Sequence, residues 1–244
     1  MRNTWNMRLW GGRGVLVAFG LVALAALAVC AAPAPALADD KSDSEQLVEK
    51  ARLTLDAFVN DPQMRDPLRS LLTGAKGVMI YPQVLRGAFV FGVSGGSGVF
   101  LARDEKASAW GGPAFYTIGE TSFGLQAGGD AAEIVLVALT ERGVSALLAP
   151  STKLGVDTAI AAGPVGAGVS ASTAGLSADV VSYTRTKGIY AGMSLQGAIV
   201  GTRGALNQAY YGQAASPTDI LIRRSVSNPQ AAGLIEALTK AGGQ

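Results

Sequence analysis

Histidine is absent from this chain of 244 residues, and cysteine occurs once, at Cys30. Imidazole is the commonest general base and metal ligand in proteins, and cysteine thiolate is the other frequent ligand of zinc. Because the body of the chain has neither group, we expect no metal site, no cofactor and no disulfide. These absences favour a protein that binds a partner over an enzyme.

The missing histidine also decides how one serine motif is interpreted. Gly92–Gly96 has the G-x-S-x-G pattern of a nucleophile elbow around Ser94. The elbow needs a histidine to take the serine proton, so we interpret this segment as a glycine-rich turn between two strands. No Gly-Lys-Ser or Gly-Lys-Thr follows it, which argues against a phosphate-binding P-loop.

Carboxylates are the remaining groups that could carry acid–base chemistry. A pair of carboxylates at a suitable separation can hydrolyse glycosides, so a carboxylate-only hydrolase stays open, with Glu120 and Glu133 as the first residues to replace. The full set of candidates is Glu105, Glu120, Asp130, Glu133, Glu141, Asp157 and Asp179.

Charged residues are sparse, at 16% of the chain, and those near its start are all positive. Three arginines are followed by an apolar run over residues 15–32 and by Ala36-Leu37-Ala38, a small-x-small cleavage site. This order is typical of an export signal, although the run is almost long enough for a retained membrane anchor. We predict that residues 1–38 are a signal peptide and that residues 39–244 form one domain, in the periplasm or at a membrane surface of the cell envelope.

Cys30 lies inside this segment, directly after Leu27-Ala28-Val29. The arrangement resembles the lipobox of bacterial lipoproteins, in which the cysteine is acylated and becomes the first mature residue. Val29 stands where that family usually has Gly, Ala or Ser. Cleavage after Ala38 and lipidation of Cys30 therefore both remain open, and lipidation would tether the protein to a membrane.

Removing residues 1–38 leaves 206 residues and changes the formal net charge from +2 to −1, because three arginines are lost. That length is enough for one sizeable core. A domain so close to neutral has no overall attraction for nucleic acid, so we expect no nucleic-acid partner. Nothing in the sequence indicates an oligomeric state.

Helical patterns occur at both ends of the predicted domain. Apolar residues at helical spacing predict an amphipathic helix over Asp40–Asn60, capped by Ser44. A second helix is expected to begin after Pro62 or Pro67 and to end near Gly74. Near the other end, we expect a helical turn over Asn207–Tyr211 that stops at Gly212. A last helix is expected to begin at Asn228-Pro229 and to run to Gly242. Thr218–Leu221, between these two, fits a connector or a strand.

The middle of the chain has the texture of short strands bounded by Gly, Pro and Ser. Ile134–Leu139 is apolar throughout and rich in β-branched residues, which predicts a central strand buried on both faces. We therefore predict an α+β fold: a mainly antiparallel β sandwich or barrel-like core, flanked by amphipathic helices at both ends. The expected strands are Gly77–Tyr81, Ala88–Val93, Gly98–Ala102, Ser122–Ala127, Glu133–Thr140, Val165–Ser170, Ala178–Arg185 and Ile189–Ser194, and Leu154–Ala162 fits strand or helix.

Aromatic residues and glycines alternate just before the central strand. Trp110, Phe115 and Phe123 lie among six glycines between residues 109 and 129. Glycines this dense let backbone approach backbone, or let a ligand approach backbone. The strip is thus either a packing device or the apolar wall of a binding site.

Several motifs in fixed order resemble the SYLF domain family. They are Ala75-Lys76-Gly77-Val78, the glycine-rich segment 87–98, Trp110–Phe115, Ser122–Gly128, Lys187–Gly192, Asn207 and the Tyr211-Gly212 pair. The resemblance covers residues 47–238, nearly all of the predicted domain, and several motifs in order are more specific than any one of them.

The resemblance implies a single domain that binds phospholipid without catalysis. Acyl chains would lie against the apolar strip, and each buried methylene would contribute about 0.8 kcal/mol. Cations would hold the phosphate, and we assign this role to Lys76, Arg86 and Lys187. The expected partners are a phospholipid or fatty acyl lipid and the membrane surface. In eukaryotic members of the family a helix near the domain's start engages phosphoinositides, but actin binding does not carry over to an exported protein.

Two other kinds of protein also fit the predicted export and the low charge. An outer-membrane β-barrel would need strands that alternate over about ten residues, and the predicted strands are shorter. A purely structural envelope protein would hold no lipid.

Overall fold

The computed structural model describes residues 37–88, 91–104, 109–123, 128–163, 178–186, 189–191 and 195–243. Leu37–Gln244 forms one compact unit. The predicted signal segment before Leu37, with Cys30, lies outside the described residues, so both the cleavage and the lipidation stay predictions. Among the described helices, none combines the length and the apolar character needed to cross a bilayer.

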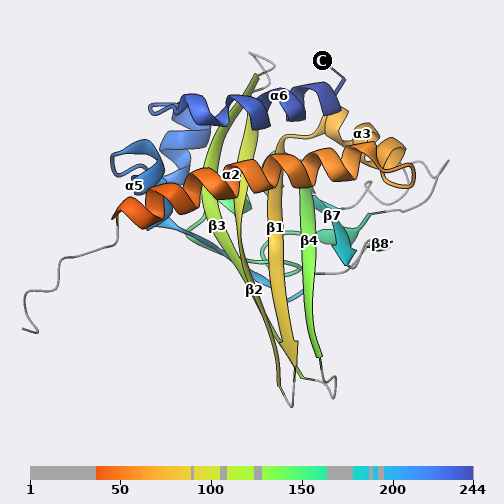
Figure 1. Cartoon of the computed structure of the whole chain (residues 1–244). Coiled ribbons are helices and arrows are strands. Elements are labelled where there is room, and N and C mark those ends of the chain that lie inside the picture. Colours follow the sequence, from red (N-terminus) through yellow and green to blue (C-terminus); the bar gives the residue numbers. More distant parts are fainter. Residues whose placement is uncertain are drawn as a thin grey trace, which may run out of the picture. The chain divides into compact units, whose positions relative to one another are not determined.

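One curled sheet runs through the unit (Figure 1). Within the described residues it has nine strands in the order β5-β9-β3-β2-β1-β4-β7-β6, and β8 also pairs with β7. All pairs are antiparallel except β6 with β7. The strands are β1 Gly77–Ala88, β2 Phe91–Asp104, β3 Ala109–Phe123, β4 Gly128–Ala138, β5 Ser151–Lys153, β6 Ile160–Ala162, β7 Val180–Thr186, β8 Ile189–Ala191 and β9 Ile199–Thr202.

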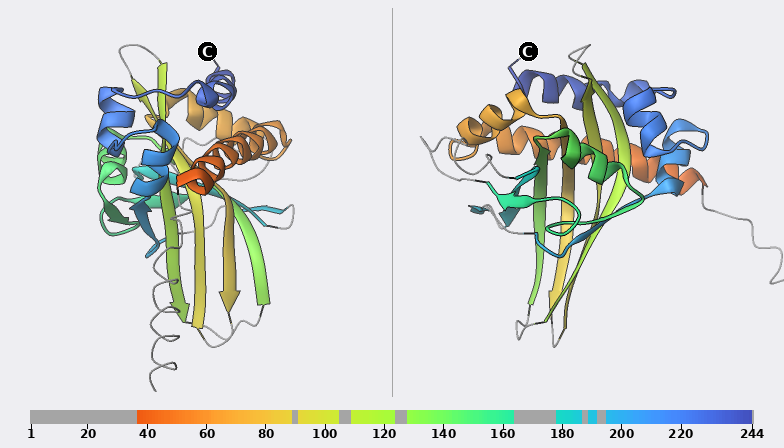
Figure 2. Two further views of the ribbon diagram at one scale, coloured as in Figure 1. Left: turned by 60° about the vertical axis from the view of Figure 1, so that its left-hand side comes forward. Right: turned by 180° about the vertical axis from the view of Figure 1, so that it is seen from behind.

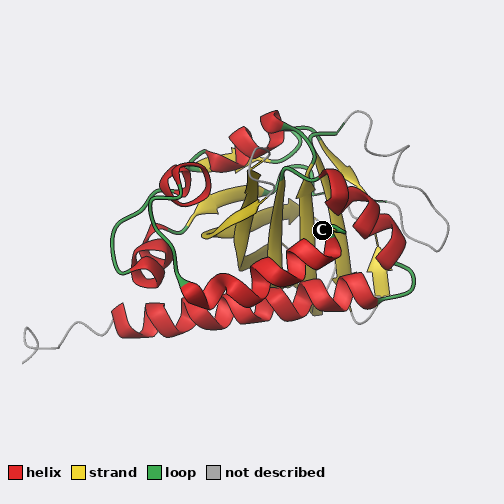
Figure 3. Ribbon diagram, turned by 90° about the horizontal axis from the view of Figure 1, so that it is seen from above, coloured by secondary structure: helices red, strands yellow, loops and turns green. Residues whose placement is uncertain are grey.

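Helices cover part of both faces of this sheet. Figure 3 shows the long helix α2 and helix α6 lying side by side over one face, and Figure 2 shows α4 on the opposite side. The lower halves of β1 to β4 extend beyond the helical layer (Figure 1). The helices are α2 Leu37–Asn60, α3 Arg65–Gly74, α4 Glu141–Leu148, α5 Gly204–Tyr211, the π-helix η1 Asp219–Arg223, the 3-10 helix η2 Pro229–Ala231 and α6 Ala232–Ala241.

Each face of the sheet has its own hydrophobic core. Val135 and Val137 of β4 pack in the core that contains α2, α3, α5 and α6, whereas Ile134 and Leu136 pack in the core on the side of α4 and η1. A strand with cores on both sides needs apolar residues at every position. This confirms the predicted α+β class and the double burial of this segment, which lies between β1 and β7 and ends at Ala138.

The helices at the two ends of the domain are confirmed with small changes. Helix α3 ends at Gly74, Gly212 follows α5 in the left-handed conformation, and the Asn228 side chain accepts a hydrogen bond from the Gln230 amide where η2 begins. Ser44 does not cap α2: the helix begins seven residues earlier, at Leu37, and the Ser44 hydroxyl donates to the Lys41 carbonyl inside it. Thr218–Leu221 belongs to the π-helix η1 and its entry rather than to a strand.

The strand predictions fail where glycine is dense. Strand β2 runs without interruption through Gly92–Gly98, so the predicted turn is wrong, and β3 takes in the whole strip from Ala109 to Phe123. Tight packing explains some of these glycines: a Cβ on Gly98 would lie 2.5 Å from the Ile80 carbonyl oxygen. Helix α4 was not predicted; it follows Thr140, whose hydroxyl accepts a hydrogen bond from the Gly143 amide at 3.0 Å. The predicted strand Val165–Ser170 lies outside the described residues.

Candidate functional site

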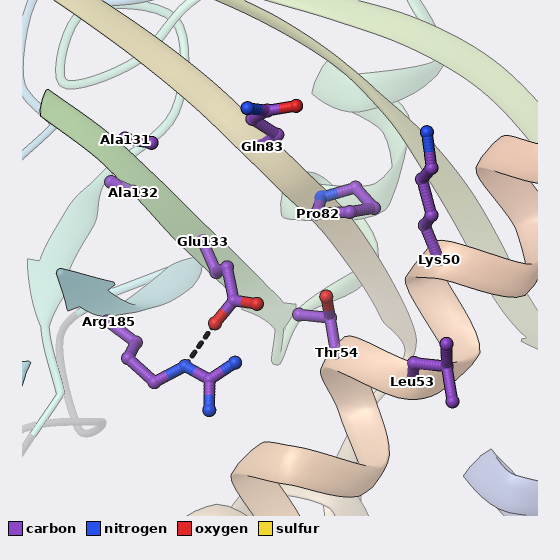
Figure 4. A pocket seen from close by; sticks show the side chains of 9 residues that line it. All are labelled: Lys50, Leu53, Thr54, Pro82, Gln83, Ala131, Ala132, Glu133 and Arg185. Atoms are coloured by element: carbon purple, nitrogen blue, oxygen red, sulfur yellow. Dashed lines mark hydrogen bonds and ion pairs between the residues drawn. The ribbon is translucent and has the colours of Figure 1, made fainter. Parts of the chain in front are cut away.

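A pocket of about 590 Å³ opens between α2 and the sheet (Figure 4). Its volume is in the range of sites for small organic ligands. Residues from one helix and three strands line it: Lys50, Leu53 and Thr54 of α2, Pro82 and Gln83 of β1, Ala131, Ala132 and Glu133 of β4, and Arg185 of β7.

A bulge in β1 shapes the wall of this pocket. The register of β1 shifts between Ile80 and Gln83 against β2, and between Tyr81 and Val84 against β4. Pro82 has no backbone N–H to donate to a neighbouring strand, so the regular ladder is interrupted there. The interruption lies beneath α2 and leaves Gln83 exposed at the pocket.

One ion pair joins strands β4 and β7 within the lining of the pocket. Glu133 and Arg185 are directly paired in the register of β4 and β7, and the Arg185 Nε donates to a Glu133 carboxylate oxygen. The Arg185 guanidinium also lies over the Phe58 ring, 5.8 Å from its centre, which is a favourable cation–π distance. This cation is thus held in place by both a carboxylate and an aromatic face.

Lys50 and Leu53 form the helical side of the pocket. Among the residues that the structure describes, Lys50 takes part in no ion pair, and Leu53 is 52% exposed although it is a large apolar residue. Because Glu133 and Arg185 neutralise each other, the pocket keeps one uncompensated positive charge, at Lys50. The site therefore combines one available cation with apolar surface.

Two residues of the predicted aromatic wall, Trp110 and Phe115, are part of the core. Phe115 is fully buried, with its ring 5.1 Å from that of Tyr210, and Trp110 is 6% exposed. Neither residue lines the pocket. Phe123 ends β3 as the register partner of Phe91, but its side chain lies outside the described part of the structure. For Trp110 and Phe115 the structure gives a packing role.

Of the three cations that we assigned to a head group, Lys76 and Arg86 lie far apart along the chain. Lys76 precedes β1 and pairs with Glu141 at 4.0 Å. Arg86 lies ten residues further along, about 30 Å away in an extended strand, in register with Asp130. The side chain of Arg86 and the whole of Lys187 lie outside the described residues, so their contact with lipid stays a prediction.

Asp179 is the carboxylate with the most strongly altered environment. It is 3% exposed and accepts hydrogen bonds from the Arg142 guanidinium at 2.6 Å, the Thr140 hydroxyl at 2.7 Å and the Ala159 amide at 3.0 Å. The bonds from Arg142, with those from Thr140 and Ala159, lower the pKa of Asp179 to about 2, although burial opposes this. A carboxylate held ionised by so many donors is a weak base, and it ties α4 to the start of β7.

The two glutamates named for a hydrolase lie on strands that are not adjacent. Glu120 is on β3 and Glu133 on β4, with β2 and β1 between them. Three strand spacings separate their backbones by about 14 Å, and the Glu133 carboxylate is already paired with Arg185. The side chain of Glu120 lies outside the described residues, so the separation of the two carboxylates stays open. No cluster of carboxylates able to hold a metal occurs among the described residues.

The fold and the pocket define a helix-covered, curled-sheet α+β domain, and comparison with known proteins places it in a family. The model of the Ysc84 family, described as "Las17-binding protein actin regulator", matches residues 119–241. This match covers half of the chain, and the chain belongs to the Ysc84 family, the SYLF family indicated by the motifs.

Three relatives show how far the similarity extends. An SH3 domain-containing protein of Schizosaccharomyces pombe is 35% identical over 147 residues, which are 58% of this chain and 34% of that protein. Protein YSC84 of Saccharomyces cerevisiae is 33% identical over 173 residues, 69% of this chain and 36% of its own length. The human SH3 domain-containing YSC84-like protein 1 is 29% identical over 170 residues, 69% of this chain and 49% of its own. The chain thus spans about a third to a half of these relatives, and the family is described by binding and regulation rather than by a reaction.

Proposed function

We propose that this protein is a non-catalytic phospholipid-binding protein of the cell envelope. The observation that carries the proposal is the pocket beneath α2, in which Lys50 stands beside the apolar side chains of Leu53 and Pro82. A phospholipid has the matching chemistry, a phosphate joined to acyl chains. Membership in the SYLF family supports the same conclusion.

The charge in the pocket suits a single phosphate. Lys50 is available to an anion, whereas the charge of the Arg185 guanidinium is balanced by Glu133. A polyanionic head group would bring several negative charges toward the Glu133 carboxylate, which would repel them. The site therefore favours a head group with one phosphodiester charge.

The energy of binding would come mainly from the acyl part. One exposed ion pair contributes about 0 to 1 kcal/mol, whereas each methylene removed from water contributes about 0.8 kcal/mol. Leu53 is half exposed and would gain burial when a chain lies against it. Lys50 would then set orientation and head-group preference more than total affinity.

The test is to extract purified protein spanning residues 39–244 with organic solvent and to identify any lipid by mass spectrometry. We expect stoichiometric phospholipid, together with co-flotation of the protein with vesicles that contain an anionic lipid. A protein that carries no lipid, ignores vesicles and turns over a defined substrate would refute the proposal and revive the carboxylate hydrolase.

Reversing the charge of Lys50 should weaken this binding. A Lys or Arg near an anionic surface contributes about 1 kcal/mol, so removing one positive charge and adding a negative one lowers affinity for anionic vesicles by roughly tenfold or more. The measurement is the fraction of Lys50→Glu protein that floats with vesicles of about 30% phosphatidylglycerol in phosphatidylcholine.

The matched control is Lys41→Glu, which makes the same charge change on the same helix. Lys41 is 61% exposed, pairs with Glu45 at 4.0 Å and does not line the pocket. If both variants lose the same amount of binding, only the net charge matters and the pocket has no special role.

The cellular location of the proposal rests on the N-terminal pattern. The three arginines, the apolar run and the cleavage site support export, and Cys30 offers a second route to the membrane through acylation. The mass of the mature N-terminus decides between cleavage after Ala38 and a lipidated Cys30. Las17 binding and actin regulation, named for the family, require contact with cytoplasmic partners, and we expect no co-sedimentation of this protein with actin filaments.

A further inference from the structure

Two glycines in the middle of neighbouring strands are not required by the fold. Gly95 of β2 and Gly119 of β3 are register partners. A Cβ on Gly95 would meet only the Ile118 carbonyl at 3.7 Å, and one on Gly119 only the Ser94 carbonyl at 3.8 Å, both ordinary contacts. Neither glycine has a positive φ. Both positions would accept a side chain.

Glycines on the other face of the same strand behave differently. A Cβ on Gly96 would lie 2.9 Å from the Val84 Cα and still closer to the Gln83 carbonyl, and one on Gly98 would collide with the Tyr81 ring. Those glycines are demanded by packing. Glycine in a strand interior lowers stability, so a pair that packing does not demand calls for another reason.

The strands on either side of this pair carry exposed apolar residues at the same level. Ile199 of β9 is in register with Gly119, and Leu85 of β1 is in register with Gly95. Ile199 is 51% exposed and Leu85 58% exposed. The two side chains stand about 14 Å apart, three strand spacings, with only glycine between them. We call Leu85, Gly95, Gly119 and Ile199 the glycine trough.

The trough is apolar along its floor and walls but polar at the end nearer α2. Two residues along each strand, Ser97 and Thr117 are register partners, and the Arg203 guanidinium donates to the Ser97 hydroxyl at 2.6 Å. Next to Leu85 in the register lies Ala131, which is exposed and also lines the pocket that contains Lys50. At the polar end Gln83 of β1, the register partner of Ser97, lines this pocket, so the trough meets the pocket there. Arg203 is the cation at this end, and Lys153 of β5 is the register partner of Ile199 at the opposite edge.

We propose that the glycine trough is the surface that binds the acyl chains of one phospholipid molecule, whose phosphate lies at the polar end near Arg203 and Lys50. This deepens the lipid-binding function proposed above and rests on it. The occupant is a lipid withdrawn from a bilayer rather than the surface of a bilayer. A flat surface would touch the ridges of Leu85 and Ile199 and leave the floor empty, whereas a chain can lie directly on glycine backbone.

Filling the floor separates these two modes of binding. In the double variant Gly95→Val/Gly119→Val, the new side chains occupy the space of the chain, and valine also favours strand structure. We expect a thermal midpoint equal to or above that of the wild type, and phospholipid per protein, measured by mass spectrometry, reduced roughly tenfold or more, since losing contact with two or more methylenes suffices.

A second variant keeps the test decisive if valine disturbs the sheet. Leu85→Thr/Ile199→Thr removes both apolar walls at exposed positions, and we expect it also to lose lipid. Its control is Ile222→Thr, an equally exposed apolar residue, 53%, on η1 and outside the trough, which should keep wild-type lipid.

The outcomes distinguish failure of the trough from failure of the proposed function. A wild-type protein that carries no lipid refutes the function itself. If the wild type carries lipid and both trough variants retain it at the same level, the acyl chains lie elsewhere and the inference is wrong. Stronger flotation of the valine variant with undiminished lipid would show docking on a bilayer surface instead.

Discussion

Gly98→Ala should destabilise the protein by about 3 kcal/mol, while Gly95→Ala, three residues earlier on the same strand, should change stability by less than about 0.5 kcal/mol. A Cβ on Gly98 would be 2.5 Å from the Ile80 carbonyl oxygen and closer still to the Tyr81 ring. The same atom on Gly95 would meet nothing nearer than 3.7 Å.

The ring that blocks Gly98 has little freedom to move away. Tyr81 is fully buried, and its hydroxyl lies 3.0 Å from the Met79 sulfur, to which it donates. Relief must therefore come from the backbone of β1, which pairs with both β2 and β4. Overpacking of this kind costs about 1 to 3 kcal/mol and occasionally more.

Thermal and urea unfolding of the two variants measures the difference. A loss of about 3 kcal/mol lowers the midpoint by roughly 6 to 12 °C in a domain of this size. Equal midpoints for Gly98→Ala and Gly95→Ala would contradict the division of these glycines into those that packing requires and those it does not.

The second large effect is expected at Asp179. Its pKa of about 2 lies below the ordinary value of 3.8, chiefly because of the hydrogen bond from Arg142. A carboxyl whose pKa is lowered by folding adds stability above its unfolded pKa, and that stability is lost as the pH falls toward the folded pKa. The difference of nearly two pH units corresponds to about 2 kcal/mol, fully present at pH 7 and disappearing between about pH 4 and pH 2.

Asp179→Asn should therefore be less stable than the wild type by about 2 to 3 kcal/mol at pH 7, since the charge-assisted bonds are weakened, and the gap should narrow below pH 4. Urea unfolding at pH 7, 4 and 2.5 checks this. The control Asp66→Asn changes a carboxylate that is 70% exposed and 3.9 Å from Arg65, and it should leave stability within about 0.5 kcal/mol at each pH. A gap for Asp179→Asn that does not depend on pH would mean that the lost energy is not electrostatic.

The terminal helices could be predicted because their signals are local. Apolar spacing along α2, proline near the start of α3 and glycine after α5 each act within a few residues. The same is true of the apolar run in β4, where five consecutive buried residues leave few alternatives to a strand with a core on each side.

The long strands β2 and β3 could not be predicted in this way. In Gly92–Gly98 and in the strip from Trp110 onward, glycine usually signals a turn, but here it allows close approach by a neighbouring strand. Whether a glycine bends the chain or admits a neighbour depends on residues such as Tyr81 that are distant in sequence. The periodicity of apolar residues along one strand carries no information about such distant contacts.

The candidate site shows the same limit. Lys50, Glu133 and Arg185 belong to elements far apart along the chain and meet only because α2 lies across the sheet at the bulge of β1. The residues singled out from the sequence for their chemistry, Trp110 and Phe115, are drawn into the core because their large apolar area is most stable there.

The sequence by itself determined the class of this protein. Its family motifs and its local helix and strand signals were enough for an α+β domain of the SYLF family. The tertiary structure alone decided where the pocket and the glycine trough lie, because both are made by the register of strands and by a helix that packs over them. Contacts between distant residues follow from the packing of whole elements, which no single stretch of sequence encodes.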